Sequence, residues 1–240
     1  MAHPLRNPKS RGLENLSARV YLEIKALILR NEIMPGQKLH HQELSERLGV
    51  SRTPVREALT RLVQEGYASL LPNRGFICKE IGMQEAEELY ELREALEAFA
   101  VEKAVGRLDG SAVERLQKKM ELYGNDTQKR FTRERLIYDQ NIHLEIAAIA
   151  SNETLKRTLG QVFERIIFKR KTDSLYDPAR GVIAHREHLR LLEAMHRRNV
   201  DEAVRIIRNH IQEGKTNVLS DLKRRKEIRD FQIVESRTSS

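Results

Sequence analysis

The sequence is poor in the residues that mark several classes of protein. It has one cysteine among 240 residues, Cys78, so it can form neither a disulfide within the chain nor a zinc finger built from several cysteines. Its N-terminus lacks the apolar stretch of a secretory signal, and no apolar run is long enough to cross a bilayer. We therefore expect a cytoplasmic protein with no membrane partner.

Glycine and proline are also scarce, with 12 and 6 residues, while 40% of the chain is hydrophobic and aromatic residues make up only 5%. This composition favours a packed, mainly helical protein, and the length allows two modest domains. The positive charge is unevenly distributed. Residues 1–80 hold 13 basic and 8 acidic residues, a net charge of +5 out of +8 for the whole chain. A basic segment of this kind attracts the phosphate backbone of nucleic acid.

Residues 40–64 have the pattern of a helix-turn-helix. Leu44 and Leu48 give a first short helix one apolar stripe, and Gly49 ends it. Ser51 stands where an N-cap residue would accept an unpaired N–H of the second helix. Pro54 falls in the first turn of that helix, where the missing N–H of proline costs little.

The second helix of this pattern leaves Arg52, Thr53, Arg56 and Thr60 on its outer face, near its N-terminal end. A recognition helix presents this end to the major groove, where arginine can pair with guanine and both residue types can hold phosphates. The alternative is an ordinary helical hairpin with a solvated basic face.

The surrounding sequence favours a winged helix over the plain hairpin. Strands are predicted at residues 68–71 and 76–79, on either side of the turn Pro72-Asn73-Arg74-Gly75, which forms a wing with an arginine at its tip. Upstream, residues 16–31 have helical apolar spacing. We predict a flexible arm at residues 1–12 and a winged helix-turn-helix domain at residues 13–80.

The rest of the chain shows no strand pattern. Residues 83–228 read as about six amphipathic helices separated by short polar turns, which predicts an all-α bundle for effector binding and dimerisation. Residues 229–240 are expected to form a flexible tail. The basic run at residues 223–226 is interpreted as the solvated end of the last helix.

Four residues of this bundle could form a metal site. Asp139 and His143 are four residues apart, so they lie on one helix face. His188 and His210 are each eleven residues from Asn199, the expected turn between the last two helices, and therefore lie at the same level in an antiparallel pair. One carboxylate and three imidazoles suit Zn²⁺, Ni²⁺ or Mn²⁺. The alternative is a set of helix surface pairs and buried polar residues.

The two halves together resemble the GntR family of bacterial transcription regulators, in its FadR subfamily and VanR-like group. The first half carries LSERLGVSRTPVREALTRLVQEGY, and the second carries YELREALEAFAVEKA, DQNIHLEIAAIASNETL and EHLRLLEAMHRRNVDEAVRIIRNHI. The resemblance covers most of residues 14–225. It implies a homodimeric, ligand-responsive regulator, expected to be a repressor, that reads a near-palindromic DNA operator and responds to a small organic acid.

The resemblance also implies roles for single residues. Arg93 falls where metal-bearing relatives hold the carboxylate of the effector, and Gln42 replaces an arginine with which some relatives bind phosphate. The remaining implied contacts are the DNA-binding residues Arg52, Thr53, Arg56, Asn73, Arg74 and Gly75, and the metal ligands Asp139, His143, His188 and His210.

Two other functions would use parts of the same sequence. A metal-dependent hydrolase could use the same four residues to activate water, but no dedicated general base is evident beside them and a basic winged helix would be unexplained. A DNA-architectural protein without an effector would not need a buried polar cluster. We therefore expect a regulator and not an enzyme.

Overall fold

The computed structural model describes residues 8–30, 32–126, 132–171 and 179–238. It divides into two compact units, one formed by Met1–Glu80 with Phe168–Lys171, the other by Ile81–Ile167 with Thr172–Ser240. Each unit has its own core of buried apolar side chains. Within the described ranges, no helix is both long enough and apolar enough to span a membrane.

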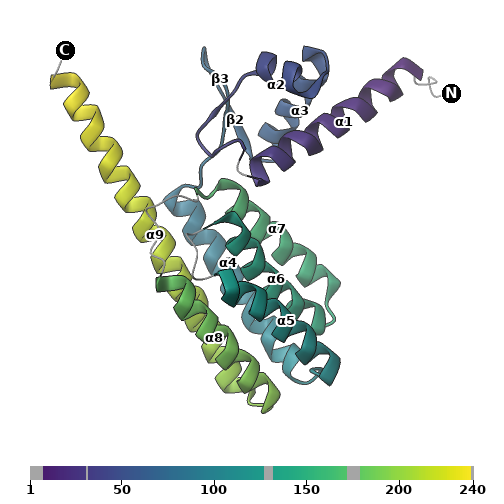
Figure 1. The fold of residues 1–240 in the computed structure, drawn as a ribbon, viewed down its shortest axis with the longest axis vertical. Helices are drawn as coiled ribbons and strands as arrows, with labels where there is room; N and C mark the ends of the chain where they lie inside the picture. The colour runs from purple at the N-terminus through teal and green to yellow at the C-terminus, as the bar shows by residue number, and fades with distance from the viewer. Residues whose placement is uncertain (1–7, 31, 127–131, 172–178, 239–240) are drawn as a thin grey trace, which may run out of the picture. The chain divides into compact units, whose positions relative to one another are not determined.

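The first unit is a winged helix-turn-helix, as predicted (Figure 1). Its three strands pair antiparallel in the order β1-β3-β2, so the hairpin of β2 and β3 forms the wing. In chain order the elements are α1 (Pro8–Leu29), β1 (Lys38–Leu39), α2 (His41–Leu48), α3 (Arg52–Gln64), β2 (Ala68–Leu71) and β3 (Gly75–Cys78).

The turn between α2 and α3 follows the local sequence signals. Gly49 ends α2 with a φ of 64°, a left-handed conformation that glycine adopts without steric cost. Pro54 is buried in the first turn of α3, and Val55 and Leu59 face the core with 0% exposure. Ser51 does hold the N-cap position with extended backbone, but its side chain makes no capping hydrogen bond.

Two features of this unit differ from the sequence prediction. The strand β1 was not predicted, because two residues are too few for a periodic pattern; Leu39 pairs with Phe76 of β3. The helix α1 begins at Pro8, so residues 8–12 of the expected flexible arm are helical. Proline is well tolerated in the first turn of a helix. Residues 1–7 of that arm lie outside the described residues.

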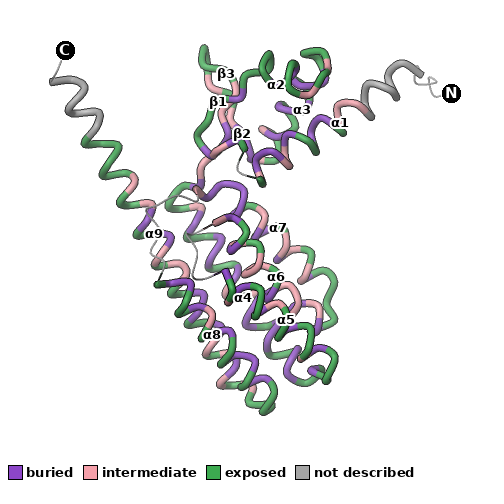
Figure 2. Tube along the Cα trace, in the orientation of Figure 1, coloured by how far each residue is buried: buried purple, intermediate pink, exposed green. Residues whose placement is uncertain are grey.

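The second unit consists of six helices in its described part, which confirms the predicted bundle (Figure 2). The helix α4 packs against α6 and α9, α5 packs against α6 and α8, and α8 packs against α9. The helices are α4 (Met83–Val105), α5 (Gly110–Asp126), α6 (Arg133–Ile149), α7 (Glu153–Lys169), α8 (Ala179–His196) and α9 (Val200–Thr238).

The last helix is longer than predicted. It continues to Thr238, whereas the sequence pattern placed its end near Lys226 and assigned residues 229–240 to a flexible tail. No glycine or proline follows Gly214, so no residue of the segment stops the helix. The basic run at residues 223–226 is therefore part of a continuing helix rather than its end.

Candidate metal centre and DNA-binding face

The structure brings the four predicted metal ligands together in the core of the bundle. Asp139 and His143 come from α6, His188 from α8 and His210 from α9, and one ligand atom from each lies within 4.8 Å of the others. The three histidines are buried, with exposed fractions of 1%, 1% and 6%. The turn at Asn199 places α8 and α9 side by side, with the rings of His188 and His210 4.6 Å apart between centroids.

Asp139 approaches His143 and His188 only at long ion-pair distances. Asp139 Oδ2 lies 3.6 Å from His143 Nε2, and its Oδ1 lies 3.4 Å from His188 Nε2. Neither ring nitrogen of His188 has a hydrogen-bond partner among the described residues. A buried polar atom in this state is costly unless something else satisfies it. A divalent cation would satisfy Nε2, the nitrogen that faces Asp139.

The donor set also fits a transition metal. Three imidazoles and one carboxylate are the ligand types that Zn²⁺, Ni²⁺ and Mn²⁺ accept. Two ligands on one ion, each bound at about 2.1 Å, lie at most about 4.2 Å apart. The ligand atoms, within 4.8 Å of one another, would therefore move closer together when they bind one ion.

The electrostatics of the cluster favour a positive charge at its centre. Burial alone would raise the pKa of Glu97, but Arg93 and His143 outweigh it and lower this pKa to about 2. Burial alone would lower the pKa of His143, but Glu97 and Asp139 raise it to about 9. For His188, burial and the neighbouring His210 lower the pKa well below its usual value. Burial also lowers the pKa of His210, so at both of these histidines it favours the neutral form, which binds metal.

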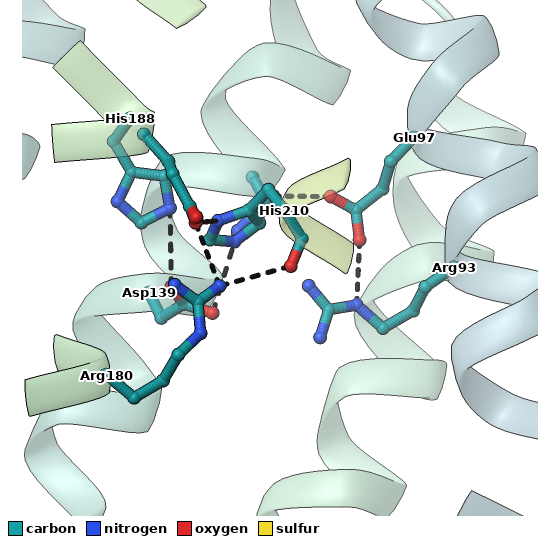
Figure 3. Close-up of polar contacts among 8 residues, drawn as sticks. Arg93, Glu97, Asp139, Arg180, His188 and His210 are labelled. Carbon is teal, nitrogen blue, oxygen red and sulfur yellow. Dashed lines mark hydrogen bonds and ion pairs between the residues drawn. The ribbon is translucent and has the colours of Figure 1, made fainter. Parts of the chain in front are cut away.

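Arg93, the predicted effector-binding residue, is buried beside this cluster. Its Nε donates to Glu97 over 2.8 Å, and its guanidinium lies 4.2 Å from the centroid of the Phe163 ring. Figure 3 shows the guanidinium pointing toward the histidines. The structure therefore brings Arg93 to the proposed metal site.

Two acidic residues next to the ligands were missed in the sequence. Glu97 contacts His143 Nδ1 through its Oε2, and Glu187 Oε2 lies 2.7 Å from His210 Nδ1. The i, i+4 spacing of Arg93 and Glu97 was a visible signal, because it predicts an ion pair on one helix face. No spacing rule connects Glu187 to His210.

The predicted DNA-binding residues lie together on the first unit. Arg52, Thr53 and Arg56 are exposed on α3. Thr53 and Arg56 line a hollow of about 530 Å³ along this helix, with Thr60 and Gln64 further along. The outer face of α3 is therefore accessible, as a recognition helix requires.

The tip of the wing is exposed as well. Asn73 and Gly75 both have positive φ, 59° and 75°, which closes the two strands into a tight turn. Arg74, between them, is exposed and available to a phosphate. The structure thus presents the six predicted DNA contacts on the surface of one small unit.

Each of the two units matches a known protein family. Residues 16–77 match the family described as bacterial regulatory proteins, gntR family, and residues 88–213 match the FCD domain. The chain is 32% identical over 185 residues to the Nta operon transcriptional regulator of Aminobacter aminovorans, covering 77% of this chain and 86% of that protein. It is 27% identical to the regulator YdhC of Bacillus subtilis, covering 82% and 93% of the two chains.

Solved structures agree with these matches. The Escherichia coli regulator McbR/YncC superposes with a TM-score of 0.66 at 25% identity, over 85% of this chain and 97% of that one. A GntR regulator structure from Rhodococcus shares the fold, with a TM-score of 0.67 at 17% identity, over 85% and 97% of the two chains. The chain therefore belongs to the GntR family of DNA-binding bacterial transcription regulators, with an FCD domain after its winged helix, as the FadR-type sequence blocks indicated.

Proposed function

We propose that this regulator is a repressor whose operator binding is controlled by a small organic acid bound at a metal site. The main support for this proposal is a cluster of four side chains in the core of the second unit, beside the buried guanidinium of Arg93. The cluster consists of Asp139, His143, His188 and His210. The first unit of the same chain presents Arg52 and Arg56 for DNA. A sensor and a DNA reader are thus combined in one chain.

The second unit has the groups that an acidic effector needs. A divalent zinc, nickel or manganese ion, when bound, would supply a Lewis-acidic centre that attracts an anionic oxygen. Four protein ligands leave open positions on an ion that accepts more than four. Arg93 would donate charge-assisted hydrogen bonds to the same carboxylate, and its stacking on Phe163 keeps its guanidinium plane oriented.

Regulation is favoured over hydrolysis by the state of the nearby acids. A hydrolase of this type would need a carboxylate free to take a proton from a metal-bound water. Glu97 is engaged by Arg93 and His143, and Glu187 by Arg180 and His210. Both carboxylates beside the ligands are therefore already committed to other partners.

We further propose that the protein acts as a homodimer on a near-palindromic operator. Two copies of α3 are needed to read the two halves of such a site. The outer face of α4 supports this arrangement, since Leu92 and Phe99, seven residues apart on the helix, are 42% and 43% exposed. Large apolar side chains along one helix face are suited to pairing with a second copy.

Effector binding would act by changing the balance of dimer geometries. An effector shifts such a balance only if it binds the DNA-competent and DNA-incompetent states with different affinity. The expected result for a repressor is weaker operator binding when the acid is present.

The test combines metal analysis with DNA binding. Wild type purified without chelator should contain about one divalent metal per chain, whereas His210→Ala and His188→Ala should contain little. A small-acid screen by thermal shift should find compounds that stabilise only wild type, and these should weaken its operator complex in a gel shift. Wild type that holds no metal and cannot be loaded would overturn the metal site. Metal-loaded protein whose operator complex resists every stabilising acid would overturn the control mechanism.

A further inference from the structure

Glu97 links an arginine to a metal-site histidine. Its Oε1 accepts from Arg93 Nε over 2.8 Å, while its Oε2 contacts His143 Nδ1. Both acid and arginine are buried, with side-chain exposures of 3% and 5%. The contact occupies Nδ1 of His143 and leaves Nε2, which lies 3.6 Å from Asp139 Oδ2, facing the other ligands.

Glu187 repeats this arrangement on the other side of the cluster. Its Oε2 lies 2.7 Å from His210 Nδ1 and accepts from Arg180 Nη2 over 2.8 Å. Arg180 also donates to the backbone oxygen of His210 over 3.2 Å. The arginine therefore holds both the carboxylate and the main chain of the histidine that the carboxylate orients (Figure 3).

We propose that Glu97 and Glu187 are positioning residues of the metal site, each held by its arginine and each fixing one imidazole with Nε2 free for the metal. This inference rests on the proposed metal site and adds the residues that set its affinity. Neither acid is proposed as a metal ligand itself, because each carboxylate already contacts a histidine nitrogen and a guanidinium.

The physical reason is the tautomer of the imidazole. A neutral imidazole carries its proton on one nitrogen and can bind metal only through the other. A carboxylate on Nδ1 keeps the proton there and makes Nε2 more basic; losing such a partner typically costs 10–100-fold in metal affinity. His188 differs, because its carboxylate contact, to Asp139, is through Nε2, and its ring packs against Tyr123.

The two acids should respond differently to the same substitution. In Glu97→Gln the single amide oxygen would accept from the charged Arg93, so the NH₂ group would face Nδ1 of His143. An NH₂ group donates, so Nδ1 would have to accept and the imidazole proton would sit on Nε2. That tautomer cannot bind a metal through Nε2. In Glu187→Gln the same oxygen could still serve both Arg180 and His210, because the carboxylate uses only Oε2 for them. We expect about 100-fold weaker Zn²⁺ binding for the first variant and about 10-fold for the second.

The experiment measures Zn²⁺ affinity by competition with a chromophoric chelator and, on the same samples, the melting temperature without metal. The controls are Glu94→Gln on α4, whose acid pairs with Arg208 over 2.7 Å, and Glu193→Gln on the exposed side of α8. Both controls should bind Zn²⁺ like wild type. Wild-type affinity in both test variants would overturn the positioning role while leaving the metal site intact, whereas wild type that binds no metal ion would overturn both.

A second measurement covers the case in which Glu97→Gln does not fold. In zinc-loaded wild type, ¹⁵N NMR of the imidazoles should show Nδ1–H on His143 and on His210. A metal-bound Nδ1 on either histidine would overturn the proposal without any variant.

Discussion

Arg93 and Glu97 form an ion pair one turn apart within α4, with Nε and Oε1 separated by 2.8 Å and both side chains almost fully buried. Because Glu97 also contacts His143, Arg93 is connected to a metal ligand through a single carboxylate. Arg93→Ala would leave that carboxylate buried without its cation, which is strongly destabilising in general. The alanine variant is therefore expected to weaken metal binding as well as effector binding.

Arg93→Lys separates the two roles. Lysine keeps a positive charge near Glu97 but lacks the planar fork that grips a carboxylate. Metal content should stay close to that of wild type, while a carboxylate effector should bind about tenfold more weakly or worse, the typical worth of one hydrogen bond to a charged group. Titration calorimetry with the effector on metal-loaded protein gives the answer. Equal affinity in both proteins would refute a direct contact between Arg93 and the acid.

Arg56→Ala should abolish selective recognition of the operator. The side chain is exposed on α3, so its removal leaves the core of the first unit intact. If it pairs with a guanine, the loss is about 1–3 kcal/mol at that base. A gel shift against a selected operator and a scrambled duplex tests this. If the variant still discriminates between the two duplexes as wild type does, Arg56 does not read a base of the operator.

Arg74→Ala should act differently, because the tip of the wing would contact phosphate. The expected effect is a modest and uniform loss across DNA sequences, with the salt dependence of binding reduced by about one charge. Affinities measured at several salt concentrations separate this from base reading. A sequence-selective loss would show instead that the wing reads bases.

The apolar face of α4 predicts the dimer interface. Replacing Leu92 and Phe99 by glutamate should give a monomer in sedimentation at micromolar concentration and reduce operator affinity, since buried charges without partners are costly. The matched control is Leu122→Glu on α5, where leucine is 46% exposed. A double variant that remains dimeric would place the interface elsewhere.

Acid should weaken the first unit through Glu65. Burial alone would raise the pKa of this acid, but its hydrogen bonds with Tyr21 and Arg61 lower it below 4.5. A lowered pKa in the folded state adds stability above pH 4.5, and this stability disappears as pH falls through the lowered value. Glu65→Gln should therefore melt below wild type at neutral pH, and the difference should shrink as the pH falls below 4.5. Glu23→Gln, an exposed acid on α1, serves as control. A difference that persists in acid would contradict an ionic origin.

The sequence by itself determined the elements that depend on near neighbours. Gly49 and Pro54 mark the turn and the second helix through their own backbone preferences. Asp139 and His143 share a face because a helix repeats every 3.6 residues. The position of His188 beside His210 could also be predicted. In two antiparallel helices joined by a short turn, residues equally far from the turn lie side by side.

Only the tertiary structure decided which groups from separate helices meet. The contact of Glu97 with His143 and that of Glu187 with His210 join helices whose relative rotation depends on the packing of the whole core. The same holds for β1, which becomes a strand only because β3 supplies its hydrogen bonds. Local propensities set which face of a helix is apolar, but side-chain packing across the bundle sets which polar atoms come within bonding distance.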